Sequence, residues 1–155
     1  MTVFTAAEAL NMALEIETNG EVFYSAVAAR QADPETKAVF EELAAQERVH
    51  HQVFSRMLGQ VSPDVELPDA DYEAYREYVQ VALDGGLFAG KDKALRMAEE
   101  AETKASAVRS ALGFEKDTLL FFYDLREMVP EKEQDAITRI IREEKAHVRR
   151  LASML

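Results

Sequence analysis

Apolar residues recur at intervals of three and four positions along four segments of the chain, the spacing that places them on one face of a helix. The pattern predicts helices over residues 5–32, 34–58 and 104–128, and a fourth from residue 130 nearly to residue 155. Only a few residues separate the first helix from the second, and the third from the fourth. Each pair is therefore expected to form an antiparallel hairpin.

Residues that favour helix ends mark the same boundaries. Thr5 and Glu8 have the spacing of a capping box, in which each side chain satisfies a free N–H group of the other residue. Asp33 is expected to cap the second helix, with Pro34 at its first position. Pro130 is expected to start the fourth helix. Asn19-Gly20, which usually favours a turn, interrupts a strong helical pattern and is interpreted as a weak point inside the first helix.

A long connection joins the two hairpins. It spans residues 59–103 and is expected to contain short helices over residues 71–83 and 92–100. A link of this length can travel the whole bundle, which favours a parallel arrangement of the second and third helices. We therefore expect an all-α, four-helix bundle with one long crossover, forming a single domain over residues 1–155. The crossover tyrosines are interpreted as packing residues or a dimer contact: Tyr72, Tyr75 and Tyr78.

Composition narrows the classes of function. Of the 155 residues, 48% are apolar and none is cysteine, which excludes disulfides, thiolate zinc sites and iron–sulfur centres within this sequence. The formal net charge of −11 disfavours nucleic acid and anionic membrane surfaces as partners. The first residues carry no pattern of a signal peptide, and no apolar run is long enough to span a membrane. A cytoplasmic location is the expectation.

The apolar stripe of each long helix is interrupted by one carboxylate. Two of the four stripes add a histidine three residues later, which lies on the same helix face. These carboxylates and histidines are the candidate metal ligands: Glu17, Glu47, His50, Glu115, Glu144 and His147.

The four carboxylates are expected to stand at one level in the bundle. Glu17 lies about 14 residues before the first interhelical turn and Glu47 about 13 residues after it, which places both at a similar height at about 1.5 Å per residue. Glu115 and Glu144 lie at comparable distances from the second turn. Each buried unpaired charge costs several kcal/mol, so the carboxylates are either mostly protonated or bound to cations. Two divalent ions supply four positive charges, and we favour this interpretation.

The two halves of the chain repeat each other around these residues. Glu17 and Glu115 are 98 residues apart, and each follows an Ala-Leu pair and precedes an aromatic pair. Glu47 and Glu144 are 97 residues apart, and each begins a Glu-x-x-His motif. The repeat predicts a pseudo-twofold axis through the site.

These motifs resemble those of the rubrerythrin-like branch of the ferritin-like superfamily, and the resemblance covers nearly all of the chain. One helical Glu from each of two helices, with Glu-x-x-His from the other two, is typical of di-iron carboxylate proteins. The matching segments are Glu17 ahead of Phe23-Tyr24, Phe40-Glu-Glu-Leu before Glu47, Glu115-Lys-Asp-Thr ahead of Phe121-Phe122, and Glu143-Glu144-Lys-x-His147.

The resemblance implies a ligand scheme and a cofactor. Glu47 and Glu144 would bridge two iron ions, for which manganese or zinc are substitutes. Glu17 with His50 would complete one ion, and the remaining ligands, Glu115 and His147, would complete the other. Two departures from rubrerythrins stand out. The sequence has no C-terminal rubredoxin segment, and Thr118 occupies the position of a second Glu on the third helix.

The function implied is an oxidoreductase that reduces hydrogen peroxide or dioxygen at the di-iron site, using an external donor such as a rubredoxin-type protein. Ferroxidase activity in iron handling and a helical interaction module with a structural metal site are the alternatives. A homodimer is expected. Tyr24 is the candidate catalytic residue beyond the metal ligands, with a plain core tyrosine as its alternative. Glu21 and His51, beside the ligands, are interpreted as a solvated residue and a rim residue.

Overall fold

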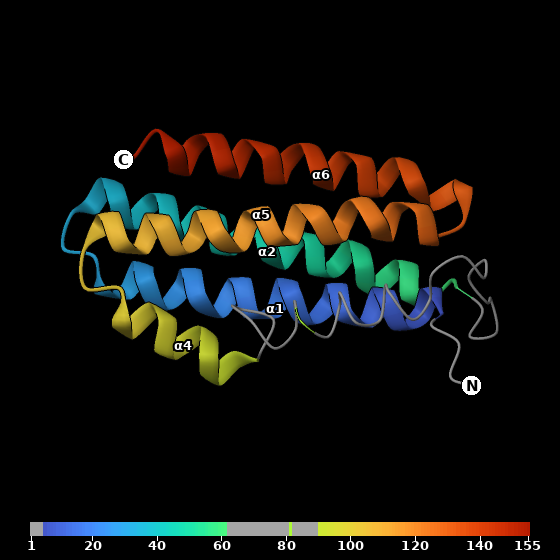
Figure 1. Ribbon diagram of the computed structural model, residues 1–155, viewed down its shortest axis with the longest axis horizontal. Helices are drawn as coiled ribbons and strands as arrows, with labels where there is room; N and C mark the ends of the chain where they lie inside the picture. The colour runs from blue at the N-terminus through green and yellow to red at the C-terminus, as the bar shows by residue number, and fades with distance from the viewer. Residues whose placement is uncertain (1–4, 62–80, 82–89) are drawn as a thin grey trace.

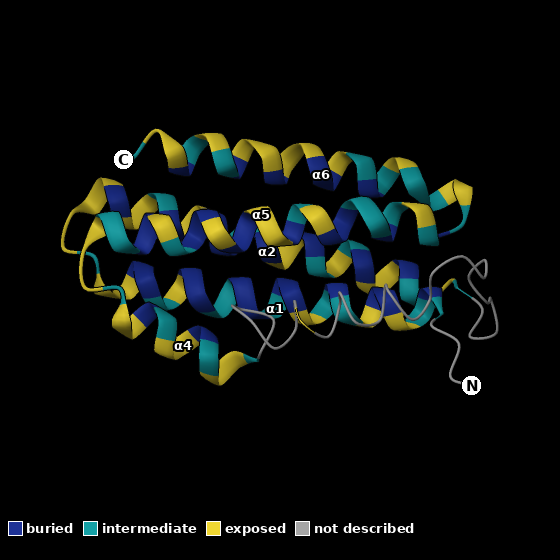
Figure 2. Ribbon diagram, viewed as in Figure 1, coloured by how far each residue is buried: buried dark blue, intermediate teal, exposed yellow. Residues whose placement is uncertain are grey.

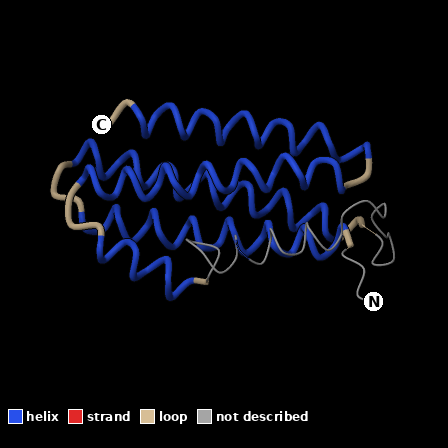
Figure 3. The backbone as a smooth tube through the Cα atoms, viewed as in Figure 1, coloured by secondary structure: helices blue, strands red, loops and turns tan. Residues whose placement is uncertain are grey.

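The amphipathic segments fold into long helices joined at both hairpins by short turns (Figure 3). The computed structural model describes residues 5–61, 81 and 90–155. Within these ranges the chain forms α1 (Ala6–Arg30), α2 (Pro34–Leu58), α4 (Lys91–Glu100), α5 (Lys104–Met128) and α6 (Glu131–Ala152). The helix expected over residues 71–83 and the three crossover tyrosines lie outside the described residues, apart from Val81.

The helices form a four-helix bundle with the predicted topology. Helices α1 and α2 form one antiparallel hairpin, α5 and α6 form the other, and α2 runs in the same direction as α5 (Figure 1). Helix α4 covers α1 and buries Ala94 and Ala98. The all-α bundle with one long crossover is thus confirmed, and none of the described helices has both the length and the apolarity needed to span a membrane.

Side chains at the helix ends explain most of the boundaries. The Thr5–Glu8 capping box forms as predicted, and the Asp33 carboxylate accepts the Thr36 N–H at 2.9 Å with Pro34 in the first turn of α2. Two boundaries differ from the prediction. Helix α1 ends at Arg30 rather than at residue 32. Helix α6 begins at Glu131, because Pro130 has a non-helical ψ of 146° and is the N-cap residue.

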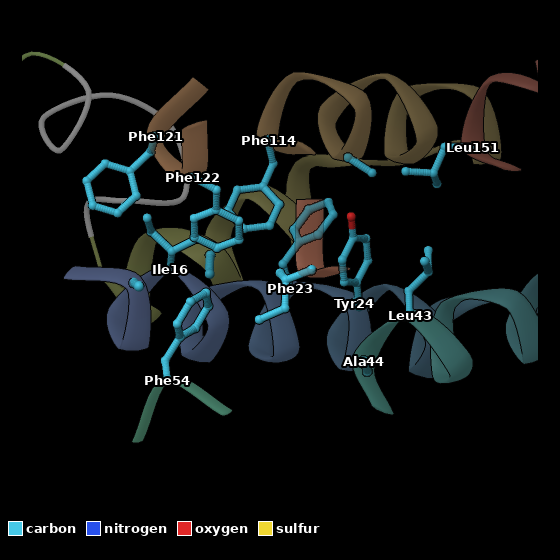
Figure 4. Packing of buried hydrophobic residues seen from close by; sticks show 14 of the residues in the cluster. Ile16, Phe23, Tyr24, Leu43, Ala44, Phe54, Phe114, Phe121, Phe122 and Leu151 are labelled. Carbon is cyan, nitrogen blue, oxygen red and sulfur yellow. The ribbon is translucent and has the colours of Figure 1, made fainter. Parts of the chain in front are cut away.

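Buried residues line the helix faces that meet inside the bundle, and exposed residues lie on the outer faces (Figure 2). Most of the buried residues are apolar. Aromatic rings fill much of the interior, where Tyr24 meets Phe23 edge to face and Phe54 packs against Phe122 (Figure 4). These rings are fully buried, which is worth about 1.5–3 kcal/mol for a side chain of Phe size. The core therefore has enough apolar contact to hold several polar groups in its midst.

Helix α1 runs without a break through Asn19-Gly20. A methyl group at Gly20 would stand 2.9 Å from Oε2 of Glu47 and 3.0 Å from Cε1 of Phe114. A Cβ atom at 2.9 Å would force one of its neighbours to shift, so this position favours glycine. Gly20 lets the backbone of α1 lie against the carboxylate of Glu47.

Candidate metal centre

The six predicted ligand residues come together inside the bundle, each more than one helical turn from the ends of its helix. They form two overlapping groups, and within each group one ligand atom per residue lies within 4.8 Å of the others. The first group is Glu17, Glu47, His50 and Glu144, and the second is Glu47, Glu115, Glu144 and His147. Glu47 and Glu144 belong to both groups. Every long helix of the bundle contributes, and all six residues are buried.

Glu144 stands between the two histidines. Its Oε1 lies 2.9 Å from Nδ1 of His50, and its Oε2 lies 2.8 Å from Nδ1 of His147. The imidazole rings are stacked, with centroids 5.9 Å apart and planes inclined by 20°. Each oxygen of this carboxylate therefore faces a different ligand group, the arrangement that a carboxylate shared by two cations requires.

Both histidines turn Nδ1 toward the carboxylates and Nε2 away from them. Nε2 of His50 lies 2.7 Å from a carboxylate oxygen of Glu143, and Nε2 of His147 contacts the amide oxygen of Gln46. Because both partners are acceptors, each Nε2 carries a proton, and Nδ1 of the neutral ring keeps its lone pair for a metal. The contacts with Gln46 and Glu143 were not predicted from the sequence. The available signal was that both residues precede a Glu-x-x-His motif by one position.

Most of the atoms that face the interior of the centre are buried without hydrogen bonds. Although Nδ1 of His50 lies near Glu144, the pair lacks the geometry of a hydrogen bond. The unsatisfied ligand atoms are both oxygens of Glu17, Glu47 and Glu144, Oε2 of Glu115, and Nδ1 of both histidines. Buried polar groups in native proteins are nearly always satisfied, so this cluster calls for a cation. Hard carboxylate oxygens mixed with imidazole nitrogens suit iron, manganese or zinc.

Without metal, burial and mutual repulsion raise the pKa values of three of the four carboxyl groups. Burial raises the pKa of Glu17 and Glu47 well above the usual range, because a charged carboxylate loses its hydration. Burial, together with repulsion from Glu144, raises the pKa of Glu115 to about 8. In the metal-free centre, these shifts favour the protonated form of all three carboxyl groups. A metal ion must displace these protons.

The pKa values of Glu144 and of both histidines shift in the direction opposite to the one that burial alone would cause. Burial would raise the pKa of Glu144, but contacts with His147 and His50 hold it well below its usual range. Burial would lower the histidine pKa values, but neighbouring carboxylates raise that of His50 to about 9 and that of His147 to about 10. Metal-free protein therefore balances the centre with two imidazolium ions around one carboxylate.

Tyr24 touches the centre through a partner on the other hairpin. Its phenol, which points from α1 into the bundle (Figure 4), donates a hydrogen bond to Oε1 of Glu115. Burial, and then the nearby carboxylates, raise the pKa of Tyr24 well above its usual value, so the hydroxyl keeps its proton. The tyrosine is thus part of the site rather than of the apolar core alone.

The neighbours expected outside the site do lie outside it. Glu21 pairs with Arg48 at 2.8 Å, and neither belongs to a ligand group. His51 is half-buried on α2. Thr118 is fully buried one turn after Glu115, and its hydroxyl has no hydrogen-bond partner. No carboxylate stands where the resemblance to rubrerythrins would place one.

The helix order and the buried centre together define a ferritin-like bundle with a candidate carboxylate–histidine metal site. The chain belongs to the rubrerythrin family, whose pattern it matches over residues 8–155. It is also similar to a candidate ferritin-like diiron-carboxylate protein from Thermotoga maritima, known from its crystal structure. That likeness has a TM-score of 0.72 and 28% sequence identity, and it covers 99% of this chain and 96% of the other. No curated protein matches the chain.

Proposed function

We propose that this protein is a non-haem di-iron oxidoreductase of rubrerythrin type, which reduces hydrogen peroxide or dioxygen. The observation that carries the proposal is the pair of overlapping ligand groups that share Glu47 and Glu144. Two ions held by shared carboxylates lie close enough to act on one O–O unit. Membership of the rubrerythrin family supports the same reading.

The two ligand groups support an assignment of residues to each ion. Glu17 and His50 would hold one iron, Glu115 and His147 would hold the other, and Glu47 and Glu144 would bridge them. When bound, two ferrous ions supply one electron each, which with two protons reduces one peroxide to two waters. An external one-electron donor protein would return both ions to the ferrous state. The two electrons and two protons account for the whole reduction of peroxide, so no further reactant is needed.

Residues of the chain itself provide the environment for this chemistry. The buried ligands exclude bulk water, which strengthens electrostatic interactions in the site. Tyr24 keeps its phenol proton and donates it in a hydrogen bond to Glu115, one of the proposed metal ligands. We propose that this hydroxyl, through its hydrogen bond, holds Glu115 in the orientation that the metal centre requires.

Anaerobic stopped-flow of the Fe(II)-loaded protein tests the proposal. Mixing with one equivalent of peroxide should oxidise both ions in one fast phase, and a reduced donor protein should restore the starting spectrum through many cycles. Tyr24→Phe should slow the oxidation while leaving two ions bound. If neither peroxide nor dioxygen oxidises the loaded protein faster than free Fe(II), the enzymatic function is wrong.

The same experiment separates the alternatives. A ferroxidase reacts preferentially with dioxygen and then releases Fe(III), so iron would leave the centre after each oxidation. A structural site would keep its ions and show no turnover with either oxidant. Measurement of bound iron before and after each cycle distinguishes these outcomes.

A further inference from the structure

The sequence repeat places one residue of each half behind a ligand histidine, but the two residues differ. Gln46 and Glu143 are 97 residues apart and occupy matching positions before Glu47 and Glu144. Each reaches across the bundle to the histidine of the other hairpin. One histidine therefore rests on a carboxylate and the other on a neutral amide.

His50 is the histidine with the charged partner. Its Nε2–H points at Oε2 of Glu143 at a distance of 2.7 Å, and the side chain of Glu143 is 55% exposed. A carboxylate that accepts the remote N–H of an imidazole makes the ring more basic, and so strengthens its bond to a metal. The position formed by Glu17 and His50 therefore has the stronger nitrogen donor.

His147 has a neutral partner that its own neighbours fix in place. The amide nitrogen of Gln46 donates to Glu42 at 3.4 Å, which leaves the amide oxygen facing His147. Arg150 lies 2.7 Å from the other oxygen of Glu42 and balances its charge. The remote nitrogen of His147 thus meets an uncharged acceptor, which polarises the ring less than a carboxylate does.

A second difference between the halves acts in the same direction. Tyr24 donates a hydrogen bond to Glu115, the terminal carboxylate on the His147 side. The residue that matches Tyr24 in the repeat, 98 positions later, is Phe122, which has no hydroxyl. A hydrogen bond to a carboxylate withdraws charge that it would otherwise offer to a metal. The position with the weaker histidine therefore also has the weaker carboxylate.

We propose that Glu143 and Gln46 are positioning residues that make the two metal positions unequal, so that the first ion binds tightly beside His50 and the second more weakly beside His147. The inference rests on the proposed di-metal centre but not on its turnover. It extends the function in one respect: the weaker position, beside His147, is the one that an ion fills last and leaves first.

Titration of the metal-free protein with Co(II) under anaerobic conditions tests this inequality. Calorimetry should resolve two steps whose dissociation constants differ by about tenfold or more, the effect typical of a changed partner behind a metal ligand. At one equivalent of Co(II), proton NMR should show a single strongly shifted, exchangeable imidazole N–H. That signal should come from His50, as assigned by its persistence in His147→Ala.

The exchange of the two partners provides the decisive variant. Glu143→Gln should weaken the first step by about 10–100-fold and bring the two steps together. The double variant Gln46→Glu with Glu143→Gln should invert the order, so that the N–H shifted at one equivalent belongs to His147. Glu127→Gln removes one negative charge from a surface side chain of α5 that contacts Arg126, and it should leave both steps unchanged.

The possible outcomes distinguish failure of the proposed inequality from failure of the metal centre. Two equal steps in the native protein, or a double variant that still fills the His50 side first, overturn the proposed inequality while leaving the oxidoreductase function standing. If Glu127→Gln weakens binding as much as Glu143→Gln, net charge rather than the histidine contact is responsible, and the inference is wrong. Failure of any Co(II) to bind would overturn the metal centre itself and the proposed function with it.

Discussion

Gly20→Ala tests how closely α1 approaches the candidate metal centre. The new methyl group would stand 2.9 Å from Oε2 of Glu47, and 3.0 and 3.1 Å from two ring atoms of Phe114. Both neighbours are buried in the bundle. The carboxylate or the ring must therefore move by several tenths of an ångström, or the backbone of α1 must shift.

Gly113 provides a matched control on α5. A methyl group there meets nothing within 4 Å, so Gly113→Ala should gain the helix propensity of alanine, about 1 kcal/mol. Gly20→Ala gains the same propensity but suffers overpacking, which costs about 1–3 kcal/mol. We expect Gly20→Ala to be less stable than Gly113→Ala by about 1–3 kcal/mol. We also expect weaker metal binding in Gly20→Ala alone, because Glu47 belongs to both ligand groups.

Denaturant unfolding of both metal-free variants measures the first expectation, and calorimetric titration with a divalent metal measures the second. If Gly20→Ala is as stable as Gly113→Ala and binds two ions with native affinity, the close approach of α1 to Glu47 does not constrain the centre. A stable Gly20→Ala that binds metal poorly would instead place the whole effect on the carboxylate.

Three further outcomes follow from the charges of the site. Metal-free protein should lose stability as pH rises from about 4.5 through about 8, because buried carboxyl groups with raised pKa values bind protons more tightly when folded. The expected slope of the unfolding free energy is about 1.4 kcal/mol per pH unit for each proton released on unfolding. Urea titrations that give constant stability between about pH 5 and pH 8 would contradict this expectation. Glu47→Ala or Glu144→Ala should reduce bound metal, measured by elemental analysis, more than Glu17→Ala or Glu115→Ala, because the first two serve both ligand groups. Thr118→Glu should lower the melting temperature of the metal-free form and widen its gap to the metal-loaded form, since it adds a buried carboxylate beside the centre; a gap no wider than in the native protein would refute this role.

The sequence predicted the fold and the gathering of the six candidate ligands because both depend on helical periodicity. Glu17 and Glu115 interrupt apolar stripes, and short turns fix the heights of the hairpin partners. Periodicity identifies the face of a helix on which a residue lies, but not the residue it meets across the bundle. For that reason Tyr24 was recognised as a neighbour of the site, while its actual partner on the other hairpin was not.

Charges inside the site were harder to predict than positions. Four carboxylates in a core suggest that all their pKa values rise, but that of Glu144 falls because both histidines contact it. The contacts behind the histidines depend on the rotation of α2 against α6, which fixes Gln46 and Glu143 opposite the rings. At the start of α6, Pro130 was predicted to be the first residue of the helix, but its ψ of 146° makes it the N-cap residue.

The distribution of ligands between the hairpins has a mechanical consequence. Neither hairpin contains a complete ligand group, since the first group takes Glu144 from α6 and the second takes Glu47 from α2. Bound ions would therefore act as cross-links between two units that are otherwise held together by side-chain packing and by polar contacts such as Tyr24–Glu115 and Arg150–Glu42. Amide hydrogen exchange in the metal-loaded protein should then slow most for motions that separate the hairpins, while fraying at the helix ends continues at its metal-free rate.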